Sequence, residues 1–187
     1  HISEIFSSMG SSIGVKHKPF VWRDNVPSFP KEEVKATLSR LKICSDKPIV
    51  IFNPNASDMS LLRRWPADYY SELIGSLAKF HQEYEYLIIG SESEREYVDR
   101  VIVASGFSDR VLNCAGKTNL RELFLLISAC YLVISNDSGP LHIASIFDKN
   151  IAGFFGPETP IVYGPVNDNA LVFYNSDIYC SPCLNVY

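Results

Sequence analysis

Long apolar runs are missing from this sequence of 187 residues. No stretch approaches the roughly 20 consecutive apolar residues that span a bilayer, and the chain does not open with a secretory signal segment. An excess of one charge is also missing, since 17 basic and 21 acidic residues leave a net charge of −4. The sequence therefore gives no reason to expect a membrane-spanning protein or a nucleic-acid partner.

Two phosphate-binding motifs are absent as well. No G-x-G-x-x-G follows the first predicted strand, which argues against a dinucleotide-dependent oxidoreductase. No G-x-x-x-x-G-K-[ST] is present, which excludes a P-loop NTPase.

The five cysteines do not form an obvious disulfide framework. An odd number of thiols in a chain of this size favours a reducing compartment. Cys114 and Cys130 lie in apolar surroundings and are expected in the core. The pair Cys180 and Cys183 could be half of a zinc site, a redox pair or a turn, but no second pair accompanies it, and we assign it no role.

Residues 1–46 are predicted to form a linker and one covering helix, followed by a Rossmann-like domain over residues 47–187. The helix is expected to begin near Pro30 and to place Val34, Leu38 and Leu41 on one face. Because the sequence begins with His1 and ends without a closing helix, we expect it to be part of a longer protein.

From residue 47 onward, short apolar runs alternate with helical patterns. This alternation predicts a doubly wound parallel sheet in an α/β domain, with helices on both faces. One helix is expected after Trp65 and Pro66, and another after Asn119, which forms a capping box with Glu122. The predicted strands are Ile49–Phe52, Tyr86–Ile89, Val111–Leu112, Leu132–Ile134 and Ile151–Phe155.

Residues 131–142 join a buried strand to a helix and are the strongest candidate for a diphosphate site. The first N–H groups of a helix have no intrahelical partners and carry the positive end of its dipole, so they bind anions. Gly139 allows close approach, Ser138 adds a hydroxyl, and His142 lies one turn into the helix. The alternative is an ordinary helix capped by Asp137 or Ser138, with His142 as a surface residue.

Polar residues follow every predicted strand, and in a parallel sheet these segments share one edge. Together they would suit a nucleoside diphosphate, with cations and N–H groups for phosphate and a carboxylate for ribose. Alternatives stay open for individual residues. One of Arg63 and Arg64 could be a solvated loop charge, and Glu92 could only stabilise the N-terminus of the helix that follows it. Trp65 is expected to be a packing anchor. The segments are 53–57 with 63–66, 90–92, 115–118, 136–139 and 156–159.

The same segments resemble glycosyltransferase family nine, the lipopolysaccharide heptosyltransferases and their relatives. The resemblance runs from Ile49 to Pro160 and is most specific in Asn136-Asp137-Ser138-Gly139-Pro140-x-His142 and in Phe155-Gly156-Pro157-x-x-Pro160. It implies that the chain is the C-terminal, nucleotide-sugar-binding half of a GT-B glycosyltransferase.

The resemblance also implies roles for individual residues. Ser57 and Arg63 would contact phosphates, Glu92 the ribose and Thr118 the adenine side of the pocket. The general base of the family is an Asp of the N-terminal domain, so this chain alone is expected to bind donor without transferring sugar. The diphosphate and the sugar would be held by Asp137, Ser138, Gly139 and His142.

The leading hypothesis is an inverting glycosyltransferase that uses a nucleotide-diphospho-sugar, such as ADP-heptose, to build a cell-surface glycan. No metal or other cofactor is expected, in line with the absence of an Asp-x-Asp motif. The acceptor would be a glycan or glycolipid, and the location cytoplasmic, with peripheral contact at the inner membrane. The rivals are a nucleotide-sugar epimerase of GT-B architecture and a non-catalytic sugar-nucleotide-binding module.

Overall fold

The computed structural model describes residues 1–15, 26–43, 46–56 and 61–183. Six parallel strands form one sheet in the order β3-β2-β1-β4-β5-β6. The strands are β1 (Ile49–Asn53), β2 (Glu85–Ile88), β3 (Val111–Asn113), β4 (Leu132–Asn136), β5 (Asn150–Phe154) and β6 (Ala170–Phe173). The predicted parallel α/β sheet is confirmed, and the strand order reverses between β1 and β4, where such sheets bind ligands.

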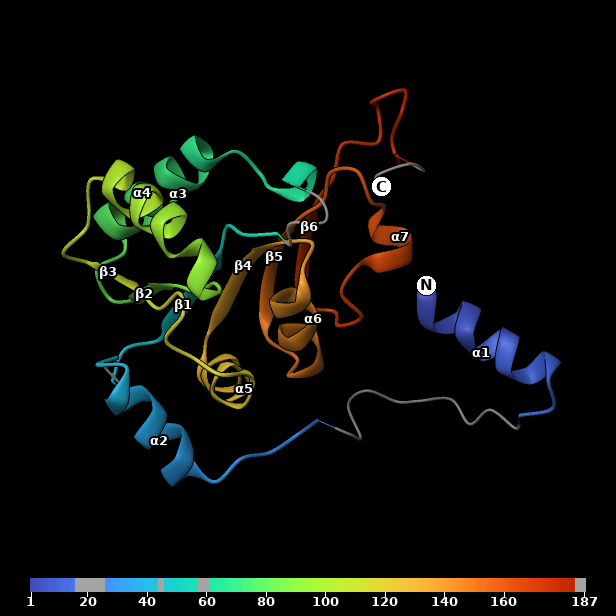
Figure 1. Cartoon of the computed structure of the whole chain (residues 1–187), viewed down its shortest axis with the longest axis horizontal. Helices are drawn as coiled ribbons and strands as arrows, with labels where there is room; N and C mark the ends of the chain where they lie inside the picture. Colours follow the sequence, from blue (N-terminus) through green and yellow to red (C-terminus); the bar gives the residue numbers. More distant parts are fainter. Residues whose placement is uncertain (16–25, 44–45, 57–60, 184–187) are drawn as a thin grey trace.

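Helices cover both faces of this sheet, as predicted (Figure 1). Helices α3 and α4 lie on one face, and α2, α5 and α6 lie on the other. Two short 3-10 turns, η2 and η3, precede α3 and α4. The bounds are α1 (Ile2–Ser12), α2 (Lys31–Arg40), η2 (Leu61–Arg63), α3 (Ala67–Phe80), η3 (Glu92–Glu94), α4 (Arg95–Ser105), α5 (Leu120–Ala129), α6 (Gly139–Ile146) and α7 (Pro160–Tyr163).

Strand β1 shows how the sequence builds these two layers. Successive side chains of a strand point to opposite faces. Ile49 and Ile51 pack with α2, α5 and α6, whereas Val50 and Phe52 pack with α3 and α4. All five residues of β1 are buried, which explains why its sequence is continuously apolar rather than alternating.

The covering helix expected near Pro30 is α2. Leu38 and Leu41 are buried against the sheet, and Val34 packs at the edge of the same cluster. Its solvent side is tied to α5, because Arg121 donates two hydrogen bonds, of 2.6 and 2.9 Å, to the carboxylate of Glu33. The division of the chain at residue 46 stays a prediction.

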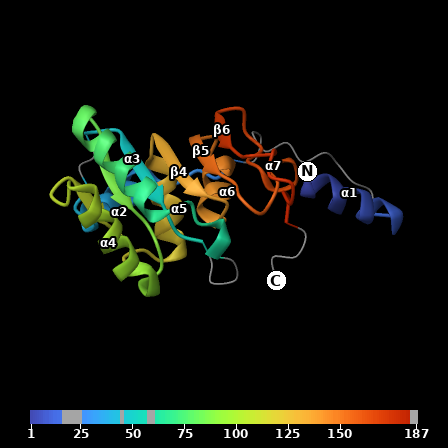
Figure 2. The same ribbon diagram turned by 90° about the horizontal axis from the view of Figure 1, so that it is seen from above.

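The elements that were not predicted include α1 and β6, which lie at the periphery of the fold. In α1, His1 and Glu4 form a capping box, yet no residue of the helix is buried. The helix lies beyond α7 and outside the two layers in both views (Figures 1 and 2). The sixth strand, β6, lies at the sheet edge; its four residues are all apolar and alternate half-buried and exposed, and this short run was not assigned as a strand from the sequence.

Cys114 and Cys130 lie in the core, as predicted. Burial away from water disfavours the thiolate and raises the pKa of Cys114 to about 11 and that of Cys130 to about 12. Both thiols are therefore protonated and unreactive at neutral pH. Over the described ranges, no helix has the length and apolar character needed to cross a membrane.

Candidate functional site

A cavity of about 590 Å³ opens at the carboxyl edge of the sheet. It extends along four neighbouring strands in the order β4, β1, β2, β3, and the segments that follow those strands line it. The lining residues are Asp137, Ser138, Gly139 and Pro140 after β4; Asn53, Asn55, Ala56 and Arg63 at and after the end of β1; Ile89, Gly90, Ser91, Ser93 and Glu94 after β2; and Thr118, Asn119, Leu120 and Leu123 after β3.

The N-terminus of α6 forms the end of the cavity next to β4. Ser138 is the N-cap residue, but its hydroxyl makes no capping hydrogen bond to the helix. Instead that hydroxyl accepts a hydrogen bond of 2.7 Å from the Asn53 side chain and donates to the Asn136 carbonyl. Pro140 has no N–H, and the Leu141 N–H donates to the Ser138 carbonyl at 3.1 Å, so the N–H groups that this turn can offer to a ligand are those of Ser138 and Gly139, which line the cavity. A Cβ on Gly139 would meet no atom within 4 Å, so this turn is open to a ligand.

Arg63 supplies the cation of this end. Its guanidinium lies 3.4 Å from the Glu158 carboxylate and 3.9 Å from that of Asp137. The Arg63 Nε atom is buried and has no hydrogen-bond partner among the described residues. Asp137, with only 7% of its side chain exposed, also lies 3.7 Å from the His142 ring, which is half-exposed outside the cavity lining. Asp137 therefore positions two cationic or hydrogen-bonding groups beside the helix N-terminus.

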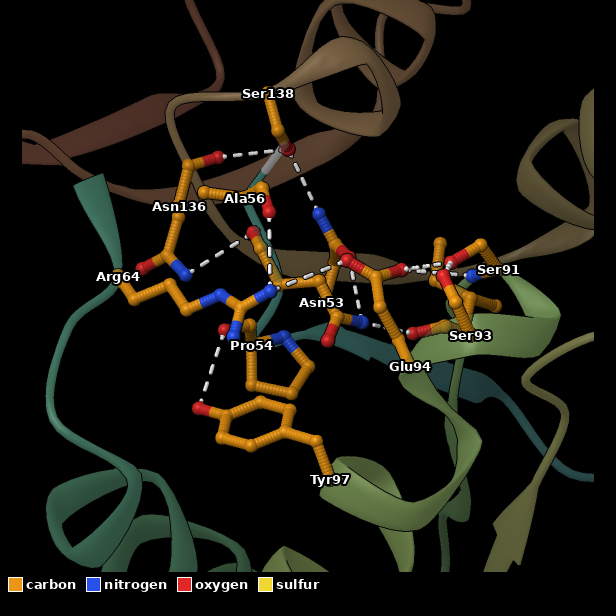
Figure 3. A network of polar contacts seen from close by, with 12 residues as sticks. Asn53, Pro54, Ala56, Arg64, Ser91, Ser93, Glu94, Tyr97, Asn136 and Ser138 are labelled. Carbon is orange, nitrogen blue, oxygen red and sulfur yellow. Dashed lines mark hydrogen bonds and ion pairs between the residues drawn. The ribbon is translucent and has the colours of Figure 1, made fainter. Parts of the chain in front are cut away.

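Arg64 contacts the loop after β1 and the segment after β2 (Figure 3). Its guanidinium donates to the Ala56 carbonyl at 3.2 Å, pairs with Glu94 at 3.5 Å and lies 4.8 Å from the centre of the Tyr97 ring. Both arginine side chains are only 21% exposed. The expectation that one of them is a solvated loop charge is therefore wrong: Arg63 lines the cavity, and Arg64 joins the β1 loop to η3 and α4.

Glu94 lines the cavity, whereas Glu92 does not. Glu94 accepts hydrogen bonds of 2.8 Å from both the N–H and the hydroxyl of Ser91, which fixes it at the end of β2 (Figure 3). Glu92 is 70% exposed, pairs with Arg95 and packs against Gly116, which has no side chain and a φ of +72°. The S-x-x-E capping box at Ser91 is the signal that could have identified Glu94 from the sequence.

The far end of the cavity, next to β3, is less polar. Thr118 and Asn119 lead into α5, and Leu120 and Leu123 provide apolar surface. The predicted capping box is confirmed: the Asn119 side chain accepts from the Glu122 N–H, and the Glu122 side chain accepts from the Asn119 N–H, each at 2.9 Å. A flat heterocycle could therefore lie here against apolar side chains and a fixed loop.

The Asn136 side chain links the end of β4 to the loop after β1 and to α3, a role that the sequence analysis did not predict. It is fully buried, and its side-chain oxygen accepts from the Trp65 N–H at 3.0 Å and from the Tyr70 hydroxyl at 3.2 Å. Its amide nitrogen donates to the Asn55 carbonyl at 3.2 Å. Trp65 is the packing anchor that was predicted, since its ring stacks on Phe154 with centroids 4.2 Å apart.

Two predicted features lie outside this cavity or outside the described residues. Ser57 falls within residues 57–60, which the structure does not describe. Cys180 and Cys183 lie beyond β6, where the Cys183 N–H donates to the Pro157 carbonyl at 2.7 Å. Within the described ranges, no group of three or more side chains is arranged to hold a metal ion.

Comparison with known proteins gives consistent results for sequence and structure. Residues 15–186 match the model of glycosyltransferase family 9 (heptosyltransferase). Lipopolysaccharide heptosyltransferase 2 of Salmonella typhimurium is 28% identical over 159 residues, which are 83% of this chain and 44% of that protein. Lipooligosaccharide heptosyltransferase 2 of Campylobacter jejuni is 31% identical over 74% of this chain and 43% of that protein.

Solved structures agree with these relatives. The structure of E. coli ADP-heptose lps heptosyltransferase II superposes with a TM-score of 0.75 and 26% identity over 88% of this chain and 52% of that one. E. coli heptosyltransferase WaaC with ADP shares the fold, with a TM-score of 0.63 and 21% identity over 88% of this chain and 47% of that one. The chain thus spans about half the length of the relatives it matches, and its six-stranded sheet corresponds to one half of a GT-B heptosyltransferase. On this evidence the chain belongs to glycosyltransferase family 9, the heptosyltransferases.

Proposed function

We propose that this chain is the donor-binding half of a heptosyltransferase and holds a nucleotide-diphospho-sugar, ADP-heptose, along the carboxyl edge of its sheet. The observation that carries the proposal is the order of chemistry along the cavity. The N-terminus of α6 lies after β4, and Arg63 from the loop after β1 reaches the same end beside Asp137. Glu94 follows β2, and the apolar side chains of Leu120 and Leu123 follow β3. A nucleoside diphosphate has its diphosphate, ribose and base in this same order.

The phosphate end would stabilise the leaving group. As the bond between sugar and diphosphate breaks, negative charge grows on the diphosphate. Arg63 and the N–H groups of Ser138 and Gly139 are fixed before reaction, so they can bind that charge without reorganising. Asp137 carries a negative charge itself, and we assign it the positioning of Arg63 and His142.

Acceptor binding and proton removal would depend on the part of the relatives that this chain does not match. We propose that an Asp in that part acts as general base and that the acceptor is a glycolipid of lipopolysaccharide synthesis. The names of the relatives support this acceptor class. The reaction would then be inverting, and the enzyme would work in the cytoplasm at the inner membrane face.

Calorimetric titration of the chain with ADP, UDP and GDP tests the donor site directly. ADP is expected to bind most tightly, in keeping with the relative solved with ADP. Absence of binding to all three at millimolar concentration would overturn the proposal. Product analysis distinguishes the glycosyltransferase from the epimerase. A full-length relative whose corresponding half is replaced by this chain is incubated with donor and acceptor. A glycosyltransferase transfers the sugar to the acceptor, whereas an epimerase changes the donor sugar without transferring it.

Glu94→Gln and Glu92→Gln form a matched pair for the ribose end. Both variants make the same chemical change, at positions two residues apart. Glu94→Gln should weaken ADP binding about ten- to hundredfold, because a charged hydrogen-bond acceptor is lost. At Glu92 the affinity should stay unchanged, since that side chain pairs with Arg95 outside the cavity lining. Isothermal titration calorimetry of both variants provides the measurement. A loss of ADP affinity in Glu92→Gln but not in Glu94→Gln would assign the ribose contact to Glu92 instead.

A further inference from the structure

A second cavity, of about 700 Å³, lies on the face of the sheet that α2, α5 and α6 cover. Its wall is built from the segment before α2, from α2 itself, from the last turn of α5 and from residues after α6. The cavity at the carboxyl edge instead takes its residues from the first turns of α5 and α6. The two cavities therefore lie at opposite ends of these helices.

Most of the wall of this second cavity is apolar. The rings of Phe29 and Phe147 lie against each other, with centroids 5.9 Å apart. Leu38 and Phe147 belong to the buried core, whereas Val26, at 39% exposed, is open to solvent. Ligand sites in proteins are typically apolar cavities of roughly 300–1,000 Å³ with a few polar groups. The second cavity has the size and the wall of such a site.

The charged groups that line this cavity are cations. Lys31, Lys35 and Lys149 line it, and no Asp or Glu of the described residues does. None of the three ammonium groups has an ion-pair or hydrogen-bond partner within the described part of the chain. A lysine beside an apolar wall packs its carbon stem along the wall and keeps its charge at the rim. The chain has a net charge of −4, so this positive rim is a local feature.

The two lysines on α2 are placed unfavourably in the absence of an anion. Lys31 is the first residue of the helix, where the positive end of the helix dipole repels a cation. Lys35 follows one turn later, so the two like charges are neighbours on the helix surface. The acids of the same turn do not provide the anion, because Glu33 pairs with Arg121 and neither it nor Glu32 lines the cavity. A bound anion would relieve both repulsions.

We propose that this second cavity binds an amphiphilic anion with one alkyl chain and a phosphate head group. The chain would lie along the rings of Phe29 and Phe147, where its methylene groups are removed from water. The head group would lie among the three lysines at the rim. A phosphate monoester carries about 1.5–2 negative charges at pH 7, so it suits a group of cations better than a carboxylate does. This site does not depend on the proposed donor site.

Three probes separate the contribution of the chain from that of the head group. Decyl phosphate, decyl maltoside and inorganic phosphate are titrated by calorimetry below the micelle concentration, and circular dichroism checks that the protein stays folded. We expect one decyl phosphate to bind per protein chain, about tenfold or more tighter than either other probe, because it alone uses both the apolar wall and the lysines. Octyl phosphate, shorter by two methylenes, should bind about tenfold more weakly than decyl phosphate.

A triple variant tests the lysines. It combines Lys31→Gln, Lys35→Gln and Lys149→Gln, and its affinity for decyl phosphate should fall about tenfold or more, because three ion pairs with the head group are lost. Its affinity for decyl maltoside should not change, since that head group is neutral. Its affinity for ADP should equal that of wild type, because none of the three lysines lines the cavity at the carboxyl edge.

A second triple variant controls for the change in net charge. Lys42→Gln, Lys47→Gln and Lys79→Gln remove the same charge from exposed positions outside both cavities, and this variant should bind decyl phosphate as wild type does. No binding of decyl phosphate by wild type, or an equal loss in the two variants, would overturn the proposal. Equal binding of octyl and decyl phosphate by wild type would also overturn it, even if the first variant does not fold. Binding to phosphatidylglycerol vesicles without binding to decyl phosphate would replace the single-molecule site with a membrane contact.

Discussion

Arg63→Gln is expected to raise the Kd for ADP about ten- to hundredfold while leaving the Kd for adenosine unchanged. A hydrogen bond to a charged group is worth about 1.5–3 kcal/mol, and Arg63 is the cation that lines the phosphate end of the cavity. Its present partners, Glu158 and Asp137, lie 3.4 and 3.9 Å away, so the guanidinium can exchange one of these loose contacts for a phosphate. Calorimetric titration with the two ligands measures the difference.

Arg64→Gln is the matched control, because it makes the same chemical change at the next residue. Arg64 is held by the Ala56 carbonyl, Glu94 and the Tyr97 ring, and it does not line the cavity. We expect Arg64→Gln to weaken the binding of adenosine and of ADP by the same factor, since Glu94 would lose its ion pair with Arg64. An equal loss for adenosine and ADP in Arg63→Gln would refute the phosphate role of Arg63.

Asn136→Ala is expected to cause the largest loss of stability of any substitution considered. It would leave the Trp65 N–H and the Asn55 carbonyl without partners and remove one of two acceptors from the Tyr70 hydroxyl. At about 1–3 kcal/mol for each buried group left unsatisfied, the unfolding free energy should fall by about 3–5 kcal/mol. For a chain of this size that corresponds to a fall in Tm of roughly 6–20 °C.

Thermal and urea unfolding of Asn136→Ala and Asn150→Ala would check this expectation. Asn150 makes a single exposed hydrogen bond, so its replacement should change the unfolding free energy by less than about 1 kcal/mol. Similar melting temperatures for wild type and Asn136→Ala would show that the hydrogen bonds of Asn136 do not stabilise the fold.

The strand ends show how far a local pattern can locate a site. Continuous apolar runs predicted a parallel sheet, and a parallel sheet brings every strand end to one edge. That step was enough to group Arg63, Thr118 and the 137–139 segment from the sequence, and all of them line the cavity. The roles given to them stay predictions.

The asparagines were overlooked for a physical reason. An Asn at a strand end is common in turns, and nothing in its immediate sequence says whether its amide is buried. Asn53, Asn55 and Asn136 form one buried network because β1 and β4 are neighbours in the sheet, although Asn55 and Asn136 are 81 positions apart in the chain.

The sequence by itself determined the fold class, the edge of the sheet that carries the site, the covering helix α2 and the capping box of α5, because each depends on periodicity or on contacts within a few residues. Only the tertiary structure showed which neighbouring residue lines the cavity: Arg63 rather than Arg64, and Glu94, which the sequence analysis did not name, rather than Glu92. These residues lie in or next to the 3-10 turns η2 and η3, where each step along the chain rotates the side chain by about 120°. Residues one or two positions apart therefore face different surroundings, and which of them faces the ligand depends on how the turn packs against the sheet.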